Sequence, residues 1–211
     1  MHLLLTDRLS CPRCGPDFGL ILRADRLENR VVYEGVLGCP NCRDSFPIVD
    51  GFGDLRAPPR GALASGLAGS PQEDEDVEGD AERLTALLGV VRGPGTLALI
   101  GEPARCAAQI AAAVEDVHML ALDSDMTSWP EMPRVSRLAS GPGIPVFSRS
   151  LRGIAIDGRL GTEWLREAAR VVAPMSRVVV THAPGSARSV LEGEGLSVLV
   201  AEAETVVAAR G

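Results

Sequence analysis

Two pairs of cysteines near the start of the chain constrain its fold more than any other feature. The pairs read Cys11-Pro-Arg-Cys14 and Cys39-Pro-Asn-Cys42, and 24 residues separate them. A Cys-x-x-Cys turn presents two thiolates on one side of a tight loop, and two such turns can close a tetrahedron around zinc. Proline at the second position of each turn restricts the backbone there. The sequence therefore predicts a structural zinc site with four ligands, Cys11, Cys14, Cys39 and Cys42.

The first 58 residues alternate short apolar runs with turns, as a small β-rich domain does. Residues 18–22 and 30–37 are typical of strands, and the polar residues 25–29 predict the tip of a hairpin between them. Gly15 follows the first cysteine pair and suits a backbone with positive φ, whereas Arg43 holds the equivalent position in the second. We therefore expect a zinc ribbon over residues 1–58.

The negative charge of the chain is concentrated in its middle. The net charge is −7, and residues 59–82 alone carry seven acidic residues and one Arg. Such a run repels itself and stays extended, which predicts an acidic, flexible linker over residues 59–82 between domains at 1–58 and 83–211. Neither flanking domain has the excess of basic residues that binding to nucleic-acid phosphates needs, so we expect no direct contact with nucleic acid.

Several features predict a cytoplasmic protein that does not contact a membrane. No apolar run reaches the roughly 18–20 residues that cross a bilayer. The leucines that follow Met1 are too few, before the charge of Asp7, for a signal peptide. Paired cysteines in such a chain favour metal binding in a reducing compartment, although disulfides in an exported protein are the alternative.

The remaining residues, 83–211, alternate strand-like and helix-like segments. A continuous apolar run predicts a buried strand at 96–100, and further strand-like segments are expected at 118–122, 135–139, 153–156 and 177–181. Residues 103–114 and 162–172 predict helices, and residues 196–202 and 205–209 predict a final antiparallel pair. The order indicates an α/β fold, with a Rossmann-like, doubly wound and mainly parallel sheet.

Polar residues at the expected strand ends are the candidates for a site, because ligands of such sheets bind at the carboxyl ends near the switch point. Asp157 and His182 are candidate general bases, and the alternative is that both only hold turns. Cys106 has no partner in the sequence and is interpreted as a small buried apolar residue. The strand-end residues are Glu102, Asp123, Ser140, Asp157 and His182.

The cysteine turns resemble those of the zinc-ribbon family of tRNA-methyltransferase activators, over about residues 2–58. The resemblance rests on residues 9–15 and 38–51, and above all on the stretch Phe46-Pro-Ile-Val-Asp-Gly51. It implies a domain that pairs with methyltransferase domains by strand addition and by burial of their apolar surface. Phe52-Gly-Asp54 departs from the Ile-Pro that usually follows in the family.

Residues 90–211 resemble a degenerate class I S-adenosylmethionine-dependent methyltransferase. Residues 163–174 with 177–180, and residues 144–147 with 151–154, carry the likeness. The resemblance implies a cofactor site that contains Gly101, Glu102, Asp123 and Ser140, in which Asp123 binds the ribose hydroxyls. The alternative for Asp123 is the N-cap of the next helix.

Departures from the family count against binding of S-adenosylmethionine. The glycine-rich turn of the family reads Gly101-Glu-Pro-Ala-Arg105 here. Glu102 places a negative charge beside the expected cofactor carboxylate, and Pro103 removes a backbone donor. Ser140 replaces an acid that the family places near the adenine.

Three functions follow from these features. The first is a non-catalytic, zinc-binding, methyltransferase-like protein whose ribbon packs on its own Rossmann-like domain or recruits a methyltransferase or translation-related protein. The second is an active S-adenosylmethionine-dependent methyltransferase with a divergent cofactor pocket. The third is an interaction module whose sheet domain binds another small molecule or protein. The sequence therefore leaves open whether the chain is an enzyme.

Overall fold

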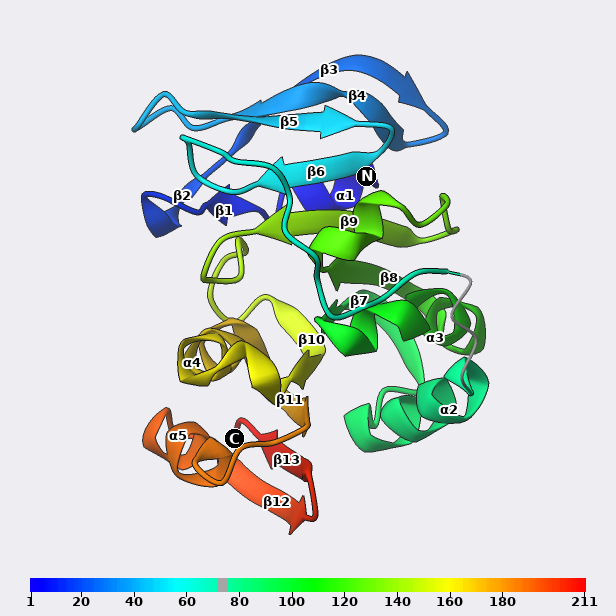
Figure 1. Ribbon diagram of the computed structural model, residues 1–211, viewed down its shortest axis with the longest axis vertical. Helices are drawn as coiled ribbons and strands as arrows, with labels where there is room; N and C mark the ends of the chain where they lie inside the picture. The colour runs from blue at the N-terminus through cyan, green and yellow to red at the C-terminus, as the bar shows by residue number, and fades with distance from the viewer. Residues whose placement is uncertain (72–75) are drawn as a thin grey trace.

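The computed structural model describes residues 1–71 and 76–211, and one sheet of eleven strands runs through most of them (Figure 1). The strands follow the spatial order β12-β13-β11-β10-β7-β8-β9-β6-β5-β4-β3. The N-terminal strands stack at one end of this sheet and the C-terminal strands at the other (Figure 1). No helix among the described residues is both long and apolar enough to cross a membrane.

The C-terminal part is a doubly wound sheet, which confirms the predicted fold class. The order β9-β8-β7-β10-β11 is the 3-2-1-4-5 order of Rossmann-like folds, with all five strands parallel. Strand β13 adds antiparallel to β11, and β12 adds antiparallel to β13. The strands are β7 (Arg92–Ile100), β8 (Glu115–Leu122), β9 (Val135–Ser140), β10 (Leu151–Asp157), β11 (Val172–Thr181), β12 (Ser197–Glu202) and β13 (Thr205–Ala209).

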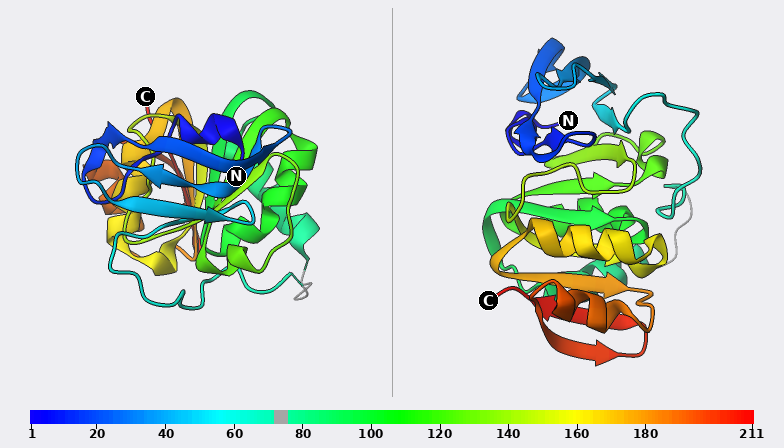
Figure 2. Two further views of the ribbon diagram at one scale, coloured as in Figure 1. Left: turned by 90° about the horizontal axis from the view of Figure 1, so that it is seen from above. Right: turned by 90° about the vertical axis from the view of Figure 1, so that its left-hand side faces the viewer.

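Helices cover both faces of this sheet, as the continuous apolar runs require. Helices α2 (Val77–Leu88) and α3 (Ala107–Ala113) pack on one face, and α4 (Thr162–Val171) and α5 (Ala187–Gly193) pack on the other (Figure 2). The last four residues of β7, residues 97–100, are fully buried because helices lie above and below them. Three short 3-10 helices, η1 (Glu102–Cys106), η2 (Ser124–Thr127) and η3 (Gly158–Leu160), follow β7, β8 and β10 at their carboxyl ends.

The N-terminal part is β-rich, as predicted, but its hairpin tip is shorter than the sequence indicated. Strand β3 continues to Glu28 and β4 begins at Val31, so Asn29 and Arg30 alone form the tip. Both residues have positive φ, 47° and 65°, as in the two-residue type I′ turn whose twist matches paired strands. The predicted tip at 25–29 is therefore wrong. The elements are α1 (Leu3–Thr6), β1 (Ser10–Cys11), β2 (Gly15–Gly19), β3 (Ile21–Glu28), β4 (Val31–Gly38), β5 (Ser45–Val49) and β6 (Phe52–Leu55).

Strand β6 joins the N-terminal strands to the Rossmann-like sheet. It pairs antiparallel with β5 on one side and parallel with β9 on the other. A Cβ atom on Gly53 would lie 2.4 Å from Cε of Met1, 2.8 Å from Cδ2 of Leu138 and 3.1 Å from Cδ1 of Leu55, so a larger residue would have to displace these buried side chains. Proline, which the activator family has here, has no N–H for a strand that is paired on both sides. The departure at residues 52–54 thus lies at the junction of the two parts.

The apolar cores of the two parts are continuous. Leu9 and Phe46 from the N-terminal strands belong to the same buried cluster as Leu138 and Val146. A β-bridge joins Leu9 to Val146, and the N–H of His2 donates to Oγ of Ser136 at 2.9 Å. The N-terminal part is therefore docked on the Rossmann-like part of the same chain through both hydrogen bonds and apolar contacts.

The range 59–82, predicted as a linker, contains structured segments. Helix α2 begins at Val77, and Asp76 caps it by accepting a hydrogen bond from the N–H of Gly79. Ala68 is buried, and Leu63 packs against the apolar core under α2 and α3. Residues 72–75 of the acidic run lie outside the described residues. The predicted domain boundaries at 58 and 83, and the flexible character of the linker, stay predictions.

We expect the stability of the docked arrangement to fall as the pH drops below about 6.5. His2 and His118 meet across the junction, with ring centroids 4.3 Å apart. Burial lowers the pKa of both imidazoles; repulsion from His118 and Arg30 adds to this at His2, and repulsion from Arg134 and Arg8 at His118. In the unfolded chain the two imidazoles become protonated near pH 6.5, whereas in the folded protein they stay neutral to a lower pH. The free energy of unfolding therefore decreases as the pH falls below about 6.5.

Thermal unfolding between pH 7.5 and 5.5 measures this effect. The H118Q variant removes one of the two imidazoles and is expected to show a shallower decline of Tm across that range. An equal decline in both proteins would contradict a role for the histidine pair.

Candidate metal centre and strand-end crevice

The four predicted ligand cysteines are brought together by two turns of the N-terminal part. Cys11 ends β1 and Cys14 precedes β2, while Cys39 and Cys42 lie on the turn that follows β4. The residue after each pair has positive φ, 91° at Gly15 and 65° at Arg43. The prediction for Gly15 is confirmed. Arg43 takes the same backbone conformation, which an L residue adopts less easily than glycine.

The sulfur atoms are spaced for a single tetrahedral ion. Sγ of Cys11 lies 3.7 Å from Sγ of Cys42, and Sγ of Cys14 lies 3.8 Å from Sγ of Cys39. All four lie within 4.8 Å of one another, and all four thiols are free. Four thiolates at a zinc–sulfur distance of about 2.3 Å would be about 3.8 Å apart. The cluster can therefore hold a metal ion, and an all-sulfur donor set favours a soft or borderline ion such as zinc.

The thiols of this cluster ionise unequally. Burial raises the pKa of Cys11, and it raises the pKa of Cys42 to about 12. Burial opposes ionisation of Cys39 too, but the N–H groups of Cys42 and Asn41 donate to its sulfur and lower its pKa to about 7. A full set of four thiolates thus needs a cation to balance its charge, and metal binding releases protons.

A crevice at the carboxyl ends of the parallel strands holds three of the predicted cofactor residues. Gly101, Asp123 and Ser140 follow or end strands β7, β8 and β9, and all three line a cavity of about 420 Å³. Residues 65–67 of the same chain line this cavity as well. A Cβ atom on Gly101 would lie 3.5 Å from Cδ1 of Leu67, so that side chain lies over the turn.

The segment at residues 65–69 is hydrogen-bonded to the floor of this crevice. The Asp123 carboxylate accepts from the N–H of Leu67 at 3.0 Å, and the Asp125 carboxylate accepts from Gly66 and Gly69 at 2.8 and 3.0 Å. A Cβ atom on Gly66 would lie 1.6 Å from Oδ1 of Asp123, so only glycine fits. Burial raises the pKa of Asp123, although the N–H groups of Leu67 and Asp125 favour its ionised form.

Asp123 also caps η2, which was the alternative interpretation of this residue. Its side chain accepts a hydrogen bond from the N–H of Asp125 at 2.9 Å. Ser140 donates to the carbonyl oxygens of Gly141 and Gly143 at 3.1 and 2.7 Å. The polar groups that the resemblance assigned to ribose and adenine therefore have partners within the protein.

The switch point between β7 and β10 is occupied by ion pairs. Nη2 of Arg159 lies 2.5 Å from Oε2 of Glu102 and 2.6 Å from Oδ2 of Asp157. Asp157 is fully buried, and its oxygens also accept from the N–H and Nε of Arg159. The Asp157 carboxylate raises the pKa of Arg159 above its usual value, which keeps the guanidinium charged. Glu102 is thus directed toward β10 and β11, away from the 420 Å³ crevice.

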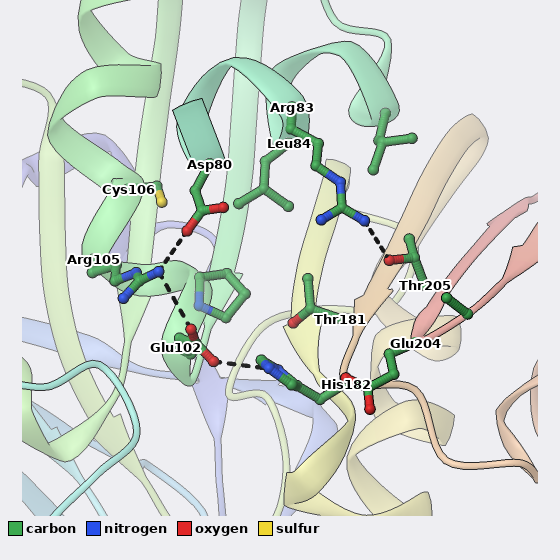
Figure 3. A pocket seen from close by; sticks show the side chains of 13 residues that line it. Asp80, Arg83, Leu84, Glu102, Arg105, Cys106, Thr181, His182, Glu204 and Thr205 are labelled. Atoms are coloured by element: carbon green, nitrogen blue, oxygen red, sulfur yellow. Dashed lines mark hydrogen bonds and ion pairs between the residues drawn. The ribbon is translucent and has the colours of Figure 1, made fainter. Parts of the chain in front are cut away.

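A second cavity, of about 560 Å³, lies on the far side of Glu102 and is lined by residues of α2, η1, β11 and β13 (Figure 3). Glu102 stands between Arg105 and His182 on its wall (Figure 3). Arg105 also pairs with Asp80 of α2 at 2.5 Å. Nη2 of Arg83 donates to the Thr205 hydroxyl at 2.7 Å across the opposite side.

The structure thus divides the predicted strand-end residues between two places. Gly101, Asp123 and Ser140 line the crevice, and Glu102 and His182 line the second cavity. Asp157 lies between them, bound to Arg159. The catalytic and cofactor assignments made from the sequence stay predictions. Arg159 and residues 65–69 were missed, because nothing in the sequence indicates that an arginine two residues after Asp157, or a Gly-rich loop, returns to the strand ends.

One family model matches the N-terminal part of the chain. Residues 2–51 match the family model described as Trm112p-like protein. No curated protein matches the chain. Among solved structures, a complex that contains the Haloferax volcanii Trm112 methyltransferase activator is similar at 14% identity and a TM-score of 0.44, covering 59% of this chain and 74% of that chain.

Two further solved structures are similar to the chain at equally low identity. Precorrin-6y C5,15-methyltransferase from Geobacter metallireducens has 14% identity and a TM-score of 0.47, covering 68% of this chain and 94% of that chain. The [4+2]-cyclase SpnF has 11% identity and a TM-score of 0.49, covering 66% of this chain and 65% of that chain. These values assign no activity or substrate. What the sequence and the topology show is an N-terminal match to the Trm112p-like family, with a four-cysteine cluster, in the same chain as a doubly wound α/β sheet.

Proposed function

We propose that this chain is a zinc-binding, methyltransferase-like protein without methyltransferase activity, whose ribbon is docked on its own Rossmann-like part. One observation carries the proposal. The N–H of Leu67 donates a hydrogen bond to the Asp123 carboxylate, and the Leu67 side chain lies over Gly101. A cofactor ribose would need the same carboxylate oxygens. Residues 65–69 therefore take the place that the cofactor of a methyltransferase would take.

The switch point supports the same proposal. The Glu102 carboxylate is held by ion pairs with Arg159 and Arg105. Pro103 has no N–H, so the turn after β7 lacks one backbone donor. An incoming cofactor would have to displace residues 65–69 from Asp123 and Asp125, which lowers its affinity. The turn offers it neither the Glu102 side chain, which the ion pairs direct away from the crevice, nor an N–H at Pro103.

The ribbon supports a binding or activating role rather than catalysis. Four cysteine ligands leave no open position on the metal for water or substrate, so the zinc would be structural. Strand β6 has partners on both sides, β5 and β9. The strand addition that the activator family makes to a separate methyltransferase is thus made within one chain, and a further methyltransferase or translation-related partner would use another surface.

The sheet ends are the surfaces open to such a partner. Strands β3 and β12 are the outermost strands of the eleven-stranded sheet. Ile21 on β3 is 65% exposed, and Leu199 on β12 is 53% exposed. Outer strands with exposed apolar side chains are suited to pairing with another protein.

A calorimetric titration with S-adenosylmethionine tests the proposal. We expect no heat of binding at micromolar concentrations of either protein or cofactor, because residues 66–69 already donate to the carboxylates of Asp123 and Asp125. A dissociation constant in the micromolar range, lost in the D123A variant, would contradict the proposal. It would favour the alternative of an active methyltransferase, to which the 420 Å³ crevice still offers space.

A further inference from the structure

Three potential metal ligands converge at the switch point, away from the cysteine cluster. Ligand atoms of Glu102, Asp157 and His182 all lie within 4.8 Å of one another. Nδ1 of His182 lies 3.2 Å from Oε2 of Glu102 and 3.8 Å from Oδ2 of Asp157. Neighbouring ligands of one octahedral ion at about 2.1 Å are about 3 Å apart. The three atoms come from the ends of adjacent strands β7, β10 and β11, which hold them in place.

The imidazole of His182 is incompletely satisfied at Nδ1. This atom is buried and makes no hydrogen bond to any described residue, although it lies 3.2 Å from Oε2 of Glu102, with which it pairs only when the ring is protonated. A buried nitrogen without a hydrogen bond is costly, and a bound ion or water is one explanation of such an atom. Because Nδ1 faces two carboxylate oxygens, a cation between the three atoms would satisfy all of them at once.

In this structure the Arg159 guanidinium supplies the positive charge at the two carboxylates. Its Nη2 atom contacts Oε2 of Glu102 and Oδ2 of Asp157, the same oxygens that face His182. It balances their charge but leaves Nδ1 of His182 unsatisfied. The Arg159 side chain is 48% exposed, whereas the Asp157 side chain is fully buried. Arg159 can therefore swing into solvent while the carboxylate stays in place.

We propose that Glu102, Asp157 and His182 form a binding site for a divalent cation such as Mn²⁺ or Mg²⁺, and that Arg159 holds the cation position until the metal displaces it. Carboxylates with one imidazole suit these harder ions, whereas the four thiolates select zinc, so the two sites take different metals. The 560 Å³ cavity beside Glu102 and His182 provides access and room for water ligands. The site does not depend on the absence of methyltransferase activity.

Mn²⁺ added to the zinc-loaded full-length chain tests the proposal by paramagnetic broadening of histidine NMR signals. The chain has three histidines, and His2 and His118 lie against each other at the junction with the N-terminal strands. We expect substoichiometric Mn²⁺ to broaden the His182 ring signals and to spare the other two. Equal broadening of all three, or none at millimolar Mn²⁺, would overturn the proposal.

Two variants separate this site from nonspecific binding. R159Q removes the competing charge and is expected to tighten Mn²⁺ binding by about tenfold, whereas E102Q is expected to weaken it by a similar factor. R188Q is the matched control, because Arg188 makes an exposed pair with Glu192 on α5 and should leave binding unchanged. Equal affinities in the wild type, R159Q and E102Q would place the ion elsewhere. If R159Q does not fold, the comparison of E102Q with the wild type decides.

Discussion

The C11S variant is expected to lose stoichiometric zinc and with it the fold of residues 1–58. Metal binding and folding are linked in small ribbons, where zinc contributes about 10–16 kcal/mol of apparent binding free energy. Serine is a poor ligand for zinc, and Cys11 is buried at the end of β1, so no other side chain readily replaces it. Elemental analysis should give close to one zinc per chain for the wild type and far less for C11S.

The same substitution should destabilise more than the ribbon. Leu9 and Phe46 share a core with Leu138 and Val146, so unfolding of the ribbon exposes apolar surface of the Rossmann-like part. Each 1 kcal/mol lost lowers Tm by about 2–4 °C for a chain of this size, so we expect a clear fall in the Tm of the Rossmann-like part.

C106S is the control for this prediction. Cys106 is also buried, but it lies on η1, far along the chain from the cysteine cluster. It should keep its zinc and lose little stability. A C11S protein with a full equivalent of zinc and an unchanged Tm would refute the four-ligand site.

The G53V variant is expected to separate the ribbon from the Rossmann-like sheet. Its side chain would be forced against the ends of Met1, Leu138 and Leu55, which are all buried and would have to shift. Overpacking of this kind costs about 2–3 kcal/mol. Because β6 is the strand that joins the two parts, we expect one cooperative unfolding transition in the wild type and two in G53V, measured by calorimetry.

G61V provides the control for G53V. A Cβ atom on Gly61 would have no heavy atom within 4 Å. This variant should unfold in one transition at the wild-type temperature. A single unchanged transition in G53V would mean that β6 does not hold the two parts together.

The four-cysteine cluster was predictable because its information is local. Two Cys-Pro-x-Cys turns fix the positions of two thiolates each, and the positive φ at Gly15 follows from its place after the turn. Helices and strands of the Rossmann-like part were predictable for a similar reason, since runs such as residues 97–100 are apolar throughout. The hairpin tip at Asn29 and Arg30 was not, because a type I′ turn needs positive φ at both residues, and arginine, unlike asparagine, rarely adopts it.

The contacts in the 420 Å³ crevice were only partly predictable from the sequence. Gly101, Asp123 and Ser140 were expected at strand ends, and the topology does bring them to one crevice. Their partners were not predictable. Gly66 and Leu67 precede Asp123 by more than fifty residues, and a Gly- and Ala-rich segment has no pattern that indicates where it packs.

The sequence by itself determined the four-cysteine turns, the five parallel strands and the altered turn at residues 101–105, because each depends on neighbouring residues. Tertiary structure alone decided that β6 pairs with β9 of the same chain, that residues 65–69 lie on Asp123, and that Arg159 bridges Glu102 and Asp157. Those contacts depend on the packing of distant segments. Burial of Leu138 against the ribbon and the close fit of Gly66 on Asp123 select them, and neither is encoded in any short stretch of the chain.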